Sequence, residues 1–566
     1  MSTLSYASGT SDAPLLGITI GDLFDRAVAQ HGGNEALVVP FQNVRWTYRE
    51  LGARVDALAR ALIALGVERG DRVGIWSTNR VEWTLTQFAT SKLGAILVNI
   101  NPAYRAAELE YALNQSGCRF LVMTDRFKTS DYNAVIDSLA PELAGARQKR
   151  GERLKLDRLP NLETIVTLGP ARPGMMSFDA LLARASEVDA KAVDERQRVL
   201  EFDDAINIQY TSGTTGFPKG ATLSHHNIVN NGYFVARLMN FTDKDRLVIP
   251  VPLYHCFGMV MGNLGSVSHG ATMIYPAEAF DAEATLAAAA KERATALFGV
   301  PTMFIAELGL ASFASFDLSH LRTGVMAGAP CPIEVMKRVQ TEMHMSEVAI
   351  CYGMTETSPV STQTRIGTPL EKQVSTVGQV HPHVEIKIVD AETGVTVPRG
   401  ALGEFCTRGY SVMLGYWNND EATAKSIDAT GWMHTSDLAV MDDQGYVNIA
   451  GRIKDMIIRG GENVYPREIE EFLYRHPKVQ EVSVIGVPDA RFGEELMAWI
   501  QLKPGQTASD EELKAFCKGE IAHYKVPRYI RFVDGFPMTV TGKIQKFRMR
   551  EQSIAELGLD ASVKTA

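Results

Sequence analysis

The stretch INIQYTSGTTGFPKG, residues 206–220, runs from an alternating strand pattern directly into a loop of glycines, hydroxyl side chains and one lysine. Glycine lets a backbone approach a ligand closely, and hydroxyl and ammonium groups can donate hydrogen bonds to anionic oxygens. The common phosphate loop ends in Gly-Lys-Ser/Thr, whereas the order here is Pro218, Lys219, Gly220. Pro218 has no N–H to donate. The stretch therefore predicts a phosphate-binding loop of another kind, at the carboxyl end of a strand.

The composition is that of an ordinary globular protein. With 566 residues, the chain is too long for one typical domain. Its 57 basic and 66 acidic side chains give a net charge of −9, which provides no overall attraction to nucleic acid or anionic membrane. No apolar run approaches the roughly 18 to 20 residues of a membrane span, and the first residues lack a signal-peptide pattern. We expect small-molecule partners, no nucleic acid and no transmembrane segment, and a homodimer is left open.

The cysteines and histidines predict no metal site of nitrogen and sulfur ligands. The six cysteines are Cys118, Cys256, Cys331, Cys351, Cys406 and Cys517. No two of them have metal-ligand spacing, and the adjacent His225 and His226 have no partner at usable spacing. A chain of this size needs no disulfide framework, so we expect a reducing, cytoplasmic location.

The first third of the chain alternates helix and strand patterns. Residues Glu50–Val67 carry leucines and valine at helical spacing. Short apolar strands are expected at 71–78, 94–100 and 118–125, with helices at 81–93 and 106–117 between them. This alternation predicts an α/β fold in which parallel sheets are covered by helices on both faces.

The texture of the sequence changes near Gly451. Before it, residues 431–450 read as a turn-rich β segment. After it, residues 466–489 read as a helix followed by a strand, and residues 510–537 as a helix, a loop and a strand. We therefore predict a large domain over residues 1–451, with parallel-sheet subdomains and a β-rich subdomain, and a small α+β domain over residues 452–566.

Six motifs, in order along the chain, resemble those of the AMP-forming adenylating enzymes. They are YTSGTTGFPKG (210–220), YGMTETSP (352–359), GEFCTRGYSVMLGYW (403–417), GWMHTSDLA (431–439), GRIKDMIIRGGENVYPREIE (451–470) and TVTGKIQKFRMR (539–550). Within that superfamily the chain is most similar to medium-chain fatty acyl-CoA synthetases, on the stretches RGGENVYPREIEEFL, HPKVQEVSVIGVPD and SVMLGYW.

The resemblance implies a two-step, ATP-dependent ligase. A fatty acid carboxylate attacks the α-phosphate of ATP, pyrophosphate leaves, and the acyl-AMP then passes its acyl group to coenzyme A. The protein mainly positions anions and neutralises developing charge. The co-substrates and cofactor implied are ATP, coenzyme A and Mg²⁺. The large domain would hold ATP and the acid, and the small domain would be mobile and carry a catalytic lysine and the coenzyme A tunnel.

The resemblance also implies roles for individual residues. Tyr352 would stack on adenine, Asp437 would bind the ribose hydroxyls, and Arg452 would contact the ribose or phosphate edge. The nucleotide-binding residues implied are Thr211, Ser212, Gly213, Thr214, Thr215, Gly216, Phe217, Pro218, Lys219, Gly328, Ala329, Pro330, Tyr352, Gly353, Met354, Thr355, Asp437, Arg452 and Lys543.

The implied catalytic residues are Lys543, Thr211, Glu356 and Lys219. Lys543 would stabilise charge on the α-phosphate, whereas Thr211 and Glu356 would hold Mg²⁺, a hard cation that prefers oxygen ligands.

The remaining residues concern the acid, the thiol and the hinge. On the resemblance, His255 would act as a gate beside the acyl pocket, and Phe257 and Val300 would contact the acyl chain. Gly460 and Gly461 would line the thiol tunnel, and Lys454 would lie at the domain hinge.

Several alternatives stay open. An acyl-AMP ligase that loads a carrier protein, or a ligase for aryl or branched acids, would share these motifs. A phosphate-loop ATPase switch is disfavoured by the Pro-Lys-Gly order. The segments 251–265 and 298–308 are apolar and contain no lysine or arginine for a second carboxylate, which favours a monocarboxylic chain of medium length.

Overall fold

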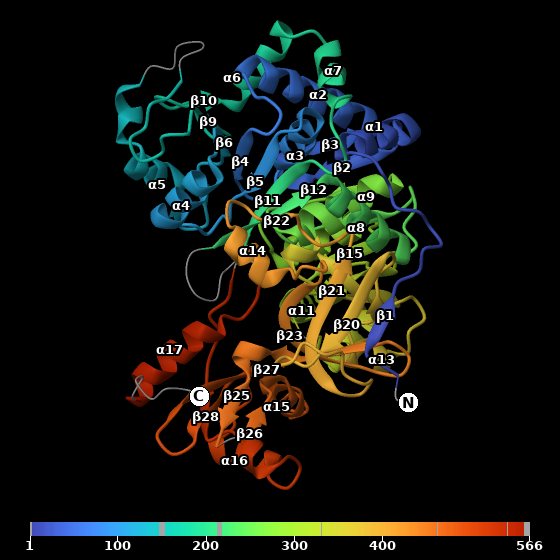
Figure 1. The fold of residues 1–566 in the computed structure, drawn as a ribbon, viewed down its shortest axis with the longest axis vertical. Helices are drawn as coiled ribbons and strands as arrows, with labels where there is room; N and C mark the ends of the chain where they lie inside the picture. The colour runs from blue at the N-terminus through green and yellow to red at the C-terminus, as the bar shows by residue number, and fades with distance from the viewer. Residues whose placement is uncertain are drawn as a thin grey trace.

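A computed structural model describes residues 3–146, 153–211, 218–329, 331–460, 462–539 and 542–559. Three large sheets, a two-stranded hairpin of β7 (Arg126–Phe127) and β8 (Ser130–Asp131), and their helices form a large domain. A small domain, orange to red, lies at its lower end (Figure 1). The predicted α/β class with a large and a small domain is confirmed. Within the described chain, no helix is long and apolar enough to cross a membrane.

The first sheet has eight strands and carries the glycine-rich loop. Its strands, in spatial order, are β10 (Met176–Ser177), β9 (Thr164–Thr167), β6 (Phe120–Met123), β4 (Arg72–Trp76), β5 (Ile96–Asn99), β11 (Ala205–Thr211), β12 (Lys219–Ser224) and β22 (Gly415–Tyr416). Pairing is parallel from β10 to β11 and antiparallel from β11 through β12 to β22. The loop does follow the carboxyl end of a strand, as predicted. After the loop the chain continues as the antiparallel strand β12, whereas the common phosphate loop is followed by a helix.

The second sheet has nine strands and packs beside the first. In spatial order they are β19 (Gln379–Val380), β18 (Val360–Gln363), β17 (Glu347–Gly353), β16 (Thr323–Ala327), β15 (Ala296–Gly299), β13 (Arg246–Val248), β14 (Thr272–Ile274), β2 (Glu35–Val39) and β3 (Val44–Thr47). Its central strands, β17 to β2, are parallel. One hydrophobic cluster joins strands and helices of both sheets.

The helices of the large domain are α1 (Ile20–His31), α2 (Tyr48–Leu65), α3 (Val81–Leu93), α4 (Ala106–Ser116), α5 (Tyr132–Leu139), α6 (Phe178–Ala183), α7 (Lys191–Gln197), α8 (His225–Leu238), α9 (Gly265–His269), α10 (Ala282–Lys291), α11 (Pro301–Leu308), α12 (Ile333–Glu342), α13 (Leu370–Ser375) and α14 (Asp420–Ser426). Helix α2 begins two residues before the predicted Glu50. The Thr47 side chain caps it, and Glu50 completes a capping box as the third helical residue. Gly66, in the left-handed region, ends it.

The third sheet is the β-rich part of the large domain. Its five antiparallel strands are β1 (Tyr6–Ser8), β20 (Val384–Val389), β21 (Leu402–Gly409), β23 (Met433–Met441) and β24 (Val447–Arg452). One face is apolar and buried, with Ile386, Ile388 and Phe405 in a cluster. Because side chains alternate along a strand, the neighbours of Phe405 point to the opposite face.

The small domain has its own sheet and core. The strands are β26 (Glu462–Val464), β25 (Ile457–Arg459), β28 (Gly493–Leu502), β27 (Val479–Asp489) and β29 (Tyr529–Phe532). The helices are α15 (Pro466–Leu473), α16 (Asp510–Cys517) and α17 (Lys546–Leu557). Two hydrophobic clusters consist only of residues from 457 onward. A short 3₁₀ turn, η7 (Ile453–Asp455), joins this domain to β24.

Candidate active site

A tight turn from the small domain brings Lys543 against the large domain. The N–H of Gly542 donates to the Thr539 carbonyl at 3.0 Å, and that of Lys543 donates to Thr539 Oγ1 at 3.0 Å. Gly542 has φ +78°, and a Cβ added there would lie 2.9 Å from Val300 Cγ2. A Cβ added to Gly328 would lie 3.7 Å from Lys543 Cε. Glycine at both positions therefore allows the turn to approach the large domain closely.

The charges around Lys543 come from elements of the large domain. The surrounding protein lowers the pKa of Lys543, and the positive charge of Arg452 lowers it further. The carboxylates of Asp437 and Glu356 act in the opposite direction. The Lys543 side chain is exposed to solvent, so water moderates the lowering of its pKa. The side chain is a cation placed among the groups that the sequence assigns to ATP.

Glu356 is held by hydroxyl groups from two other strands. It lies on the single turn η6 (Thr355–Thr357) and is only 4% exposed. Thr211 Oγ1 donates to Glu356 Oε1 at 3.1 Å, and Tyr416 OH donates to the same oxygen at 2.8 Å. Within the described chain, Oε2 of Glu356 accepts no hydrogen bond. This donor set fits a hard cation such as Mg²⁺, because it offers carboxylate and hydroxyl oxygens in one place.

Lys219 belongs to the same group. Its Nζ lies 4.9 Å from the centre of the Tyr416 ring, which is within the range of a cation–π contact. Burial and the neighbouring Glu356 raise the pKa of the Tyr416 hydroxyl, which therefore stays a hydrogen-bond donor at neutral pH. The structure thus brings together Lys219, Thr211 and Glu356, three of the four predicted catalytic residues.

Asp437 is the buried carboxylate on the ribose side of the expected site. It is 7% exposed, and its two oxygens are both engaged. Tyr352 OH donates to Oδ2 at 2.6 Å, and Arg452 Nε donates to Oδ1 at 3.0 Å. The Tyr352 ring lies edge-on to Phe405, with 5.0 Å between centroids. The structure therefore brings Tyr352, Asp437 and Arg452 together.

His255 and Phe257 lie at the start of the π-helix η4 (Phe257–Leu264). His255 Nδ1 accepts the Phe257 N–H at 3.1 Å. Burial, and then the charge of Lys543, lower the pKa of His255 to about 3, so the imidazole is neutral at physiological pH. The Phe257 ring packs on Phe298 at 5.5 Å. A neutral side chain beside Lys543 fits the predicted gate better than a general base.

The remaining adenine-side residues lie at strand ends. Gly353 ends β17, where a Cβ would lie 1.8 Å from the Pro359 carbonyl oxygen, so only glycine fits. The N–H of Met354 donates to that same oxygen at 3.0 Å. Thr355 and Met354 lead into the turn that holds Glu356. Gly328 and Ala329 follow β16, and Gly328 has φ +91°.

Some predicted residues lie outside the described residues or apart from the site. Ser212, Gly213, Thr214, Thr215, Gly216, Phe217, Pro330 and Gly461 lie outside the described residues; Pro218 directly precedes β12. Gly460, with φ +60°, packs near Phe492 within the small domain. Lys454 lies on η7 with a solvent-exposed side chain, and partial desolvation by the surrounding protein and then the charge of Arg452 lower its pKa.

Two residues near these groups were not singled out from the sequence. Tyr416 donates a hydrogen bond to Glu356. It lies within the motif at 403–417, which was the one sequence feature that pointed to this part of the chain. Cys256 is fully buried, with Sγ 3.9 Å from Thr355 Oγ1, and the charges of Lys543 and Glu356 act on it. No spacing in the sequence connects Cys256 to these partners.

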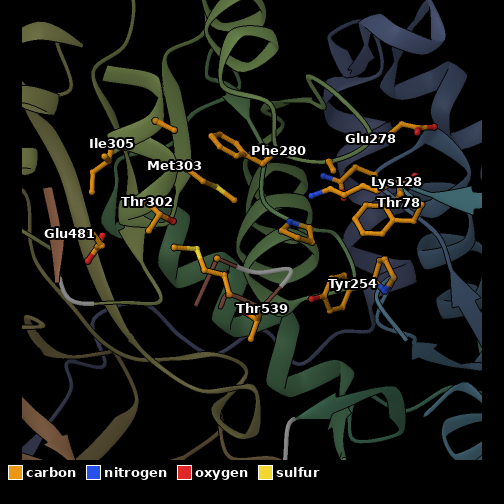
Figure 2. A pocket seen from close by; sticks show the side chains of 18 of the residues that line it. Thr78, Lys128, Tyr254, Glu278, Phe280, Thr302, Met303, Ile305, Glu481 and Thr539 are labelled. Atoms are coloured by element: carbon orange, nitrogen blue, oxygen red, sulfur yellow. The ribbon is translucent and has the colours of Figure 1, made fainter. Parts of the chain in front are cut away.

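A cavity of about 430 Å³ lies beside the Lys543 turn, between the large and small domains. Figure 2 shows Tyr254, Phe280 and Met303 on its walls, with Thr539 of the turn close by. Lys128 and Glu278 lie at one end and Glu481 of the small domain at the other (Figure 2). An apolar cavity that reaches the Lys543 turn can hold an acyl chain or the arm of a thiol.

Lys543 of the small domain lies within the electrostatic reach of two carboxylates of the large domain: Glu356, predicted to bind Mg²⁺, and Asp437, predicted to bind the ribose. This arrangement defines an adenylate-forming enzyme, in which one site collects ATP and a carboxylic acid.

The chain belongs to the AMP-binding enzyme family. The family model matches residues 24–417, and the model of the AMP-binding enzyme C-terminal domain matches residues 468–543. The similarity to acyl-CoA synthetases expected from the motifs is thereby confirmed.

Individual relatives agree. The Bacillus subtilis protein "Putative acyl-CoA synthetase YngI" is 49% identical over 97% of this chain and 100% of its own length. The mouse (Mus musculus) protein "Medium-chain acyl-CoA ligase ACSF2, mitochondrial" is 44% identical over 98% of this chain and 91% of its own. Among solved structures, the anthranilate CoA ligase AuaEII in complex with anthranoyl-AMP is 29% identical, with a TM-score of 0.83 over 97% of this chain and 99% of its own.

Proposed function

We propose that this protein uses ATP to activate a medium-chain fatty acid as acyl-AMP and then transfers the acyl group to coenzyme A. The observation that carries the proposal is the position of Lys543, beside Gly328 and within the electrostatic reach of Glu356 and Asp437. A cation there opposes negative charge that builds on the α-phosphate during attack by the carboxylate.

The other site residues have proposed roles that follow from their contacts. Thr211 and Glu356 would hold Mg²⁺, which when bound would neutralise phosphate charge, and Tyr416 would keep Glu356 in place. Lys219 and the 212–217 loop would bind the outer phosphates. Asp437 and Arg452 would bind the ribose edge, and Tyr352, Gly328 and Ala329 would form the adenine side.

Medium chain length is supported by three observations. Two apolar segments flank the Lys543 turn: 251–265 contributes Tyr254 to the cavity, and 298–308 contributes Met303 and Ile305. The mouse relative is named as a medium-chain ligase. The cavity has the volume of a small ligand, and its walls are mainly apolar.

The two half-reactions need different access to the site. While Lys543 and its turn lie against Val300, they occupy part of the interdomain space that a thiol arm would need. We propose that residues 452–566 move as a domain about Lys454, and that Gly460 and Gly461 line the thiol tunnel after the movement. The separate hydrophobic clusters of the small domain support movement as a unit.

The proposed location is intracellular and cytoplasmic. All six cysteines are free and buried, which suits a reducing compartment. The mouse relative is named as mitochondrial, so an organelle is the alternative.

The test is a product assay with a panel of acids. Release of AMP and pyrophosphate from ATP, dependent on an acid of medium length, would support the proposal, whereas ADP and phosphate would exclude it. Consumption of free coenzyme A distinguishes this ligase from one that loads a carrier protein. An acid panel from acetate to palmitate, with benzoates, then identifies the substrate, and a preference for benzoates would favour the aryl-acid alternative.

A further inference from the structure

Three potential metal ligands meet on the face of the five-stranded sheet opposite Phe405, the residue on which the Tyr352 ring packs. They are Glu404 and Cys406 on β21 and His434 on β23. Cys406 Sγ lies 3.5 Å from His434 Nδ1, and the same nitrogen lies 2.9 Å from Glu404 Oε2. The three ligand atoms all lie within 4.8 Å of one another. Across the described residues, this is the one group of three such side chains found so close together.

Strand pairing brings these residues together. Cys406 and His434 are direct partners in the antiparallel register of β21 and β23. A register shift lies between Glu404 and Cys406, and Ser436 opposite has φ +59°. Such a bulge re-aims side chains locally. The Ser436 N–H donates to Glu404 Oε1 at 2.9 Å, which fixes the carboxylate and leaves Oε2 directed at His434.

The far side of the His434 ring also has a partner. Its Nε2 lies 3.7 Å from Asp428 Oδ2. The other oxygen of Asp428 accepts the N–H groups of Thr430 at 2.8 Å and Trp432 at 3.0 Å, so this carboxylate is fixed. Histidines that bind metals usually direct their second nitrogen at a carboxylate, which orients the ring and increases its basicity.

We propose that Glu404, Cys406 and His434 form a binding site for a divalent transition metal ion, with Zn²⁺ as the best fit. Thiolate, imidazole and carboxylate together suit Zn²⁺ or Co²⁺, whereas Mg²⁺ takes oxygen ligands almost exclusively. With Zn–S of about 2.3 Å and Zn–N of about 2.0 Å, a tetrahedral site places sulfur and nitrogen about 3.5 Å apart. The observed Sγ–Nδ1 distance of 3.5 Å already has this value.

The remaining ligand needs only a small movement. The same geometry separates nitrogen and oxygen by about 3.3 Å, so Glu404 Oε2 moves outward by a few tenths of an ångström from its present hydrogen bond. His434 is 30% exposed, which leaves room for water as the fourth ligand. Bound metal joins β21 to β23, the strand that carries Asp437 three residues after His434.

Sequence spacing predicts no site of this kind, because Cys406 and His434 are 28 positions apart and only the strand register makes them neighbours. The competing interpretation is a hydrogen-bonded Glu404–His434 pair beside an unrelated buried thiol. The two interpretations differ in whether the group takes up metal.

The experiment uses the full chain without an added histidine tag, first stripped of metal with a chelator. Titration with Co²⁺ should give one equivalent bound, with a thiolate-to-cobalt charge-transfer band in the near ultraviolet and the visible bands of four-coordinate cobalt. Zn²⁺ should displace the cobalt and remove both bands. Zn²⁺ should also raise the melting temperature of the wild type.

The variants are Cys406→Ala, His434→Gln and, as a matched control, Cys517→Ala, which removes another buried thiol in the small domain. Cys406→Ala should lose the charge-transfer band, and His434→Gln should weaken cobalt binding at least about tenfold. Cys517→Ala should bind like the wild type. Circular dichroism and melting of the metal-free forms check that each variant folds. No cobalt uptake by folded wild type, or a charge-transfer band that survives in Cys406→Ala, would overturn the proposal.

Discussion

Replacing Tyr416 with phenylalanine should weaken Mg²⁺ binding, and so raise the Mg²⁺ concentration that adenylation needs, without disturbing the shape of the site. The substitution removes the hydroxyl that donates to Glu356 Oε1 at 2.8 Å and keeps the ring that lies under Lys219. Glu356 retains its bond from Thr211 at 3.1 Å. The only group lost is therefore one donor to a buried carboxylate.

The magnitude follows from the kind of bond. A hydrogen bond to a charged group contributes about 1.5 to 3 kcal/mol. At about 1.4 kcal/mol per factor of ten, this corresponds to roughly a 10- to 100-fold change in equilibrium constant. Loss of a partner behind a metal ligand typically weakens metal affinity by about the same range. We expect the Mg²⁺ concentration for half-maximal rate to rise by about 10- to 100-fold.

The assay is acid-dependent ATP–pyrophosphate exchange, measured across a Mg²⁺ series at saturating ATP and acid. Excess Mg²⁺ should restore most of the wild-type rate. The matched control is Tyr48→Phe, which removes a buried hydroxyl that donates to the Ala271 carbonyl at 2.7 Å, in the core of the large domain. That variant should lose stability and keep its Mg²⁺ dependence. A folded Tyr416→Phe enzyme with an unchanged Mg²⁺ curve would refute the assignment of Glu356 as a metal ligand held by Tyr416.

Three further predictions concern other parts of the structure. Lys543→Ala should slow adenylation by about 10²- to 10³-fold and leave thioester formation from supplied acyl-AMP largely intact. The control is Lys546→Ala, which removes a lysine that donates to Glu470 at 2.7 Å. Equal loss in both half-reactions would contradict the role of Lys543. Asp437→Ala should raise the KM for ATP more than it lowers kcat, and unchanged ATP kinetics would remove Asp437 from the site. Burial lowers the pKa of His225 from 6.5 to about 4, so between these pH values the unfolded state binds more protons, and stability should fall as pH drops from about 6.5 toward 4. Over that range the urea midpoint of unfolding should depend less steeply on pH in His225→Gln than in the wild type, and equal pH dependence would contradict the prediction.

The spacing of apolar residues predicted helices and strands well, because this periodicity is set by residues close together in the sequence. The predicted helix at 81–93 has the bounds of α3, and the strand patterns at 71–78 and 118–125 contain β4 and β6. The motif residues Lys543, Glu356 and Asp437 are brought into one region, as the resemblance implied. Their joint role in the reaction stays a prediction.

Other features depend on which strands pair, and the sequence does not state this. After the glycine-rich loop the chain continues as β12, which pairs antiparallel with β11, and no helix starts directly at the loop. This pairing is visible only in the structure. The contact of Tyr416 with Glu356 joins residues 60 positions apart. The approach of Cys406 to His434 likewise exists only once β21 and β23 are paired.

Asp437 connects the proposed ribose-binding edge to the domain junction. One of its oxygens accepts from Arg452, the last residue of β24, which is followed directly by η7. A ribose hydroxyl that donated to this oxygen would compete with the hydrogen bond from Arg452. If Asp437 binds the ribose as proposed, this shared carboxylate would couple nucleotide occupancy to the orientation of the small domain. Because coupling free energies are reciprocal, any orientation that draws Arg452 away must also change the affinity for the ribose by the same factor.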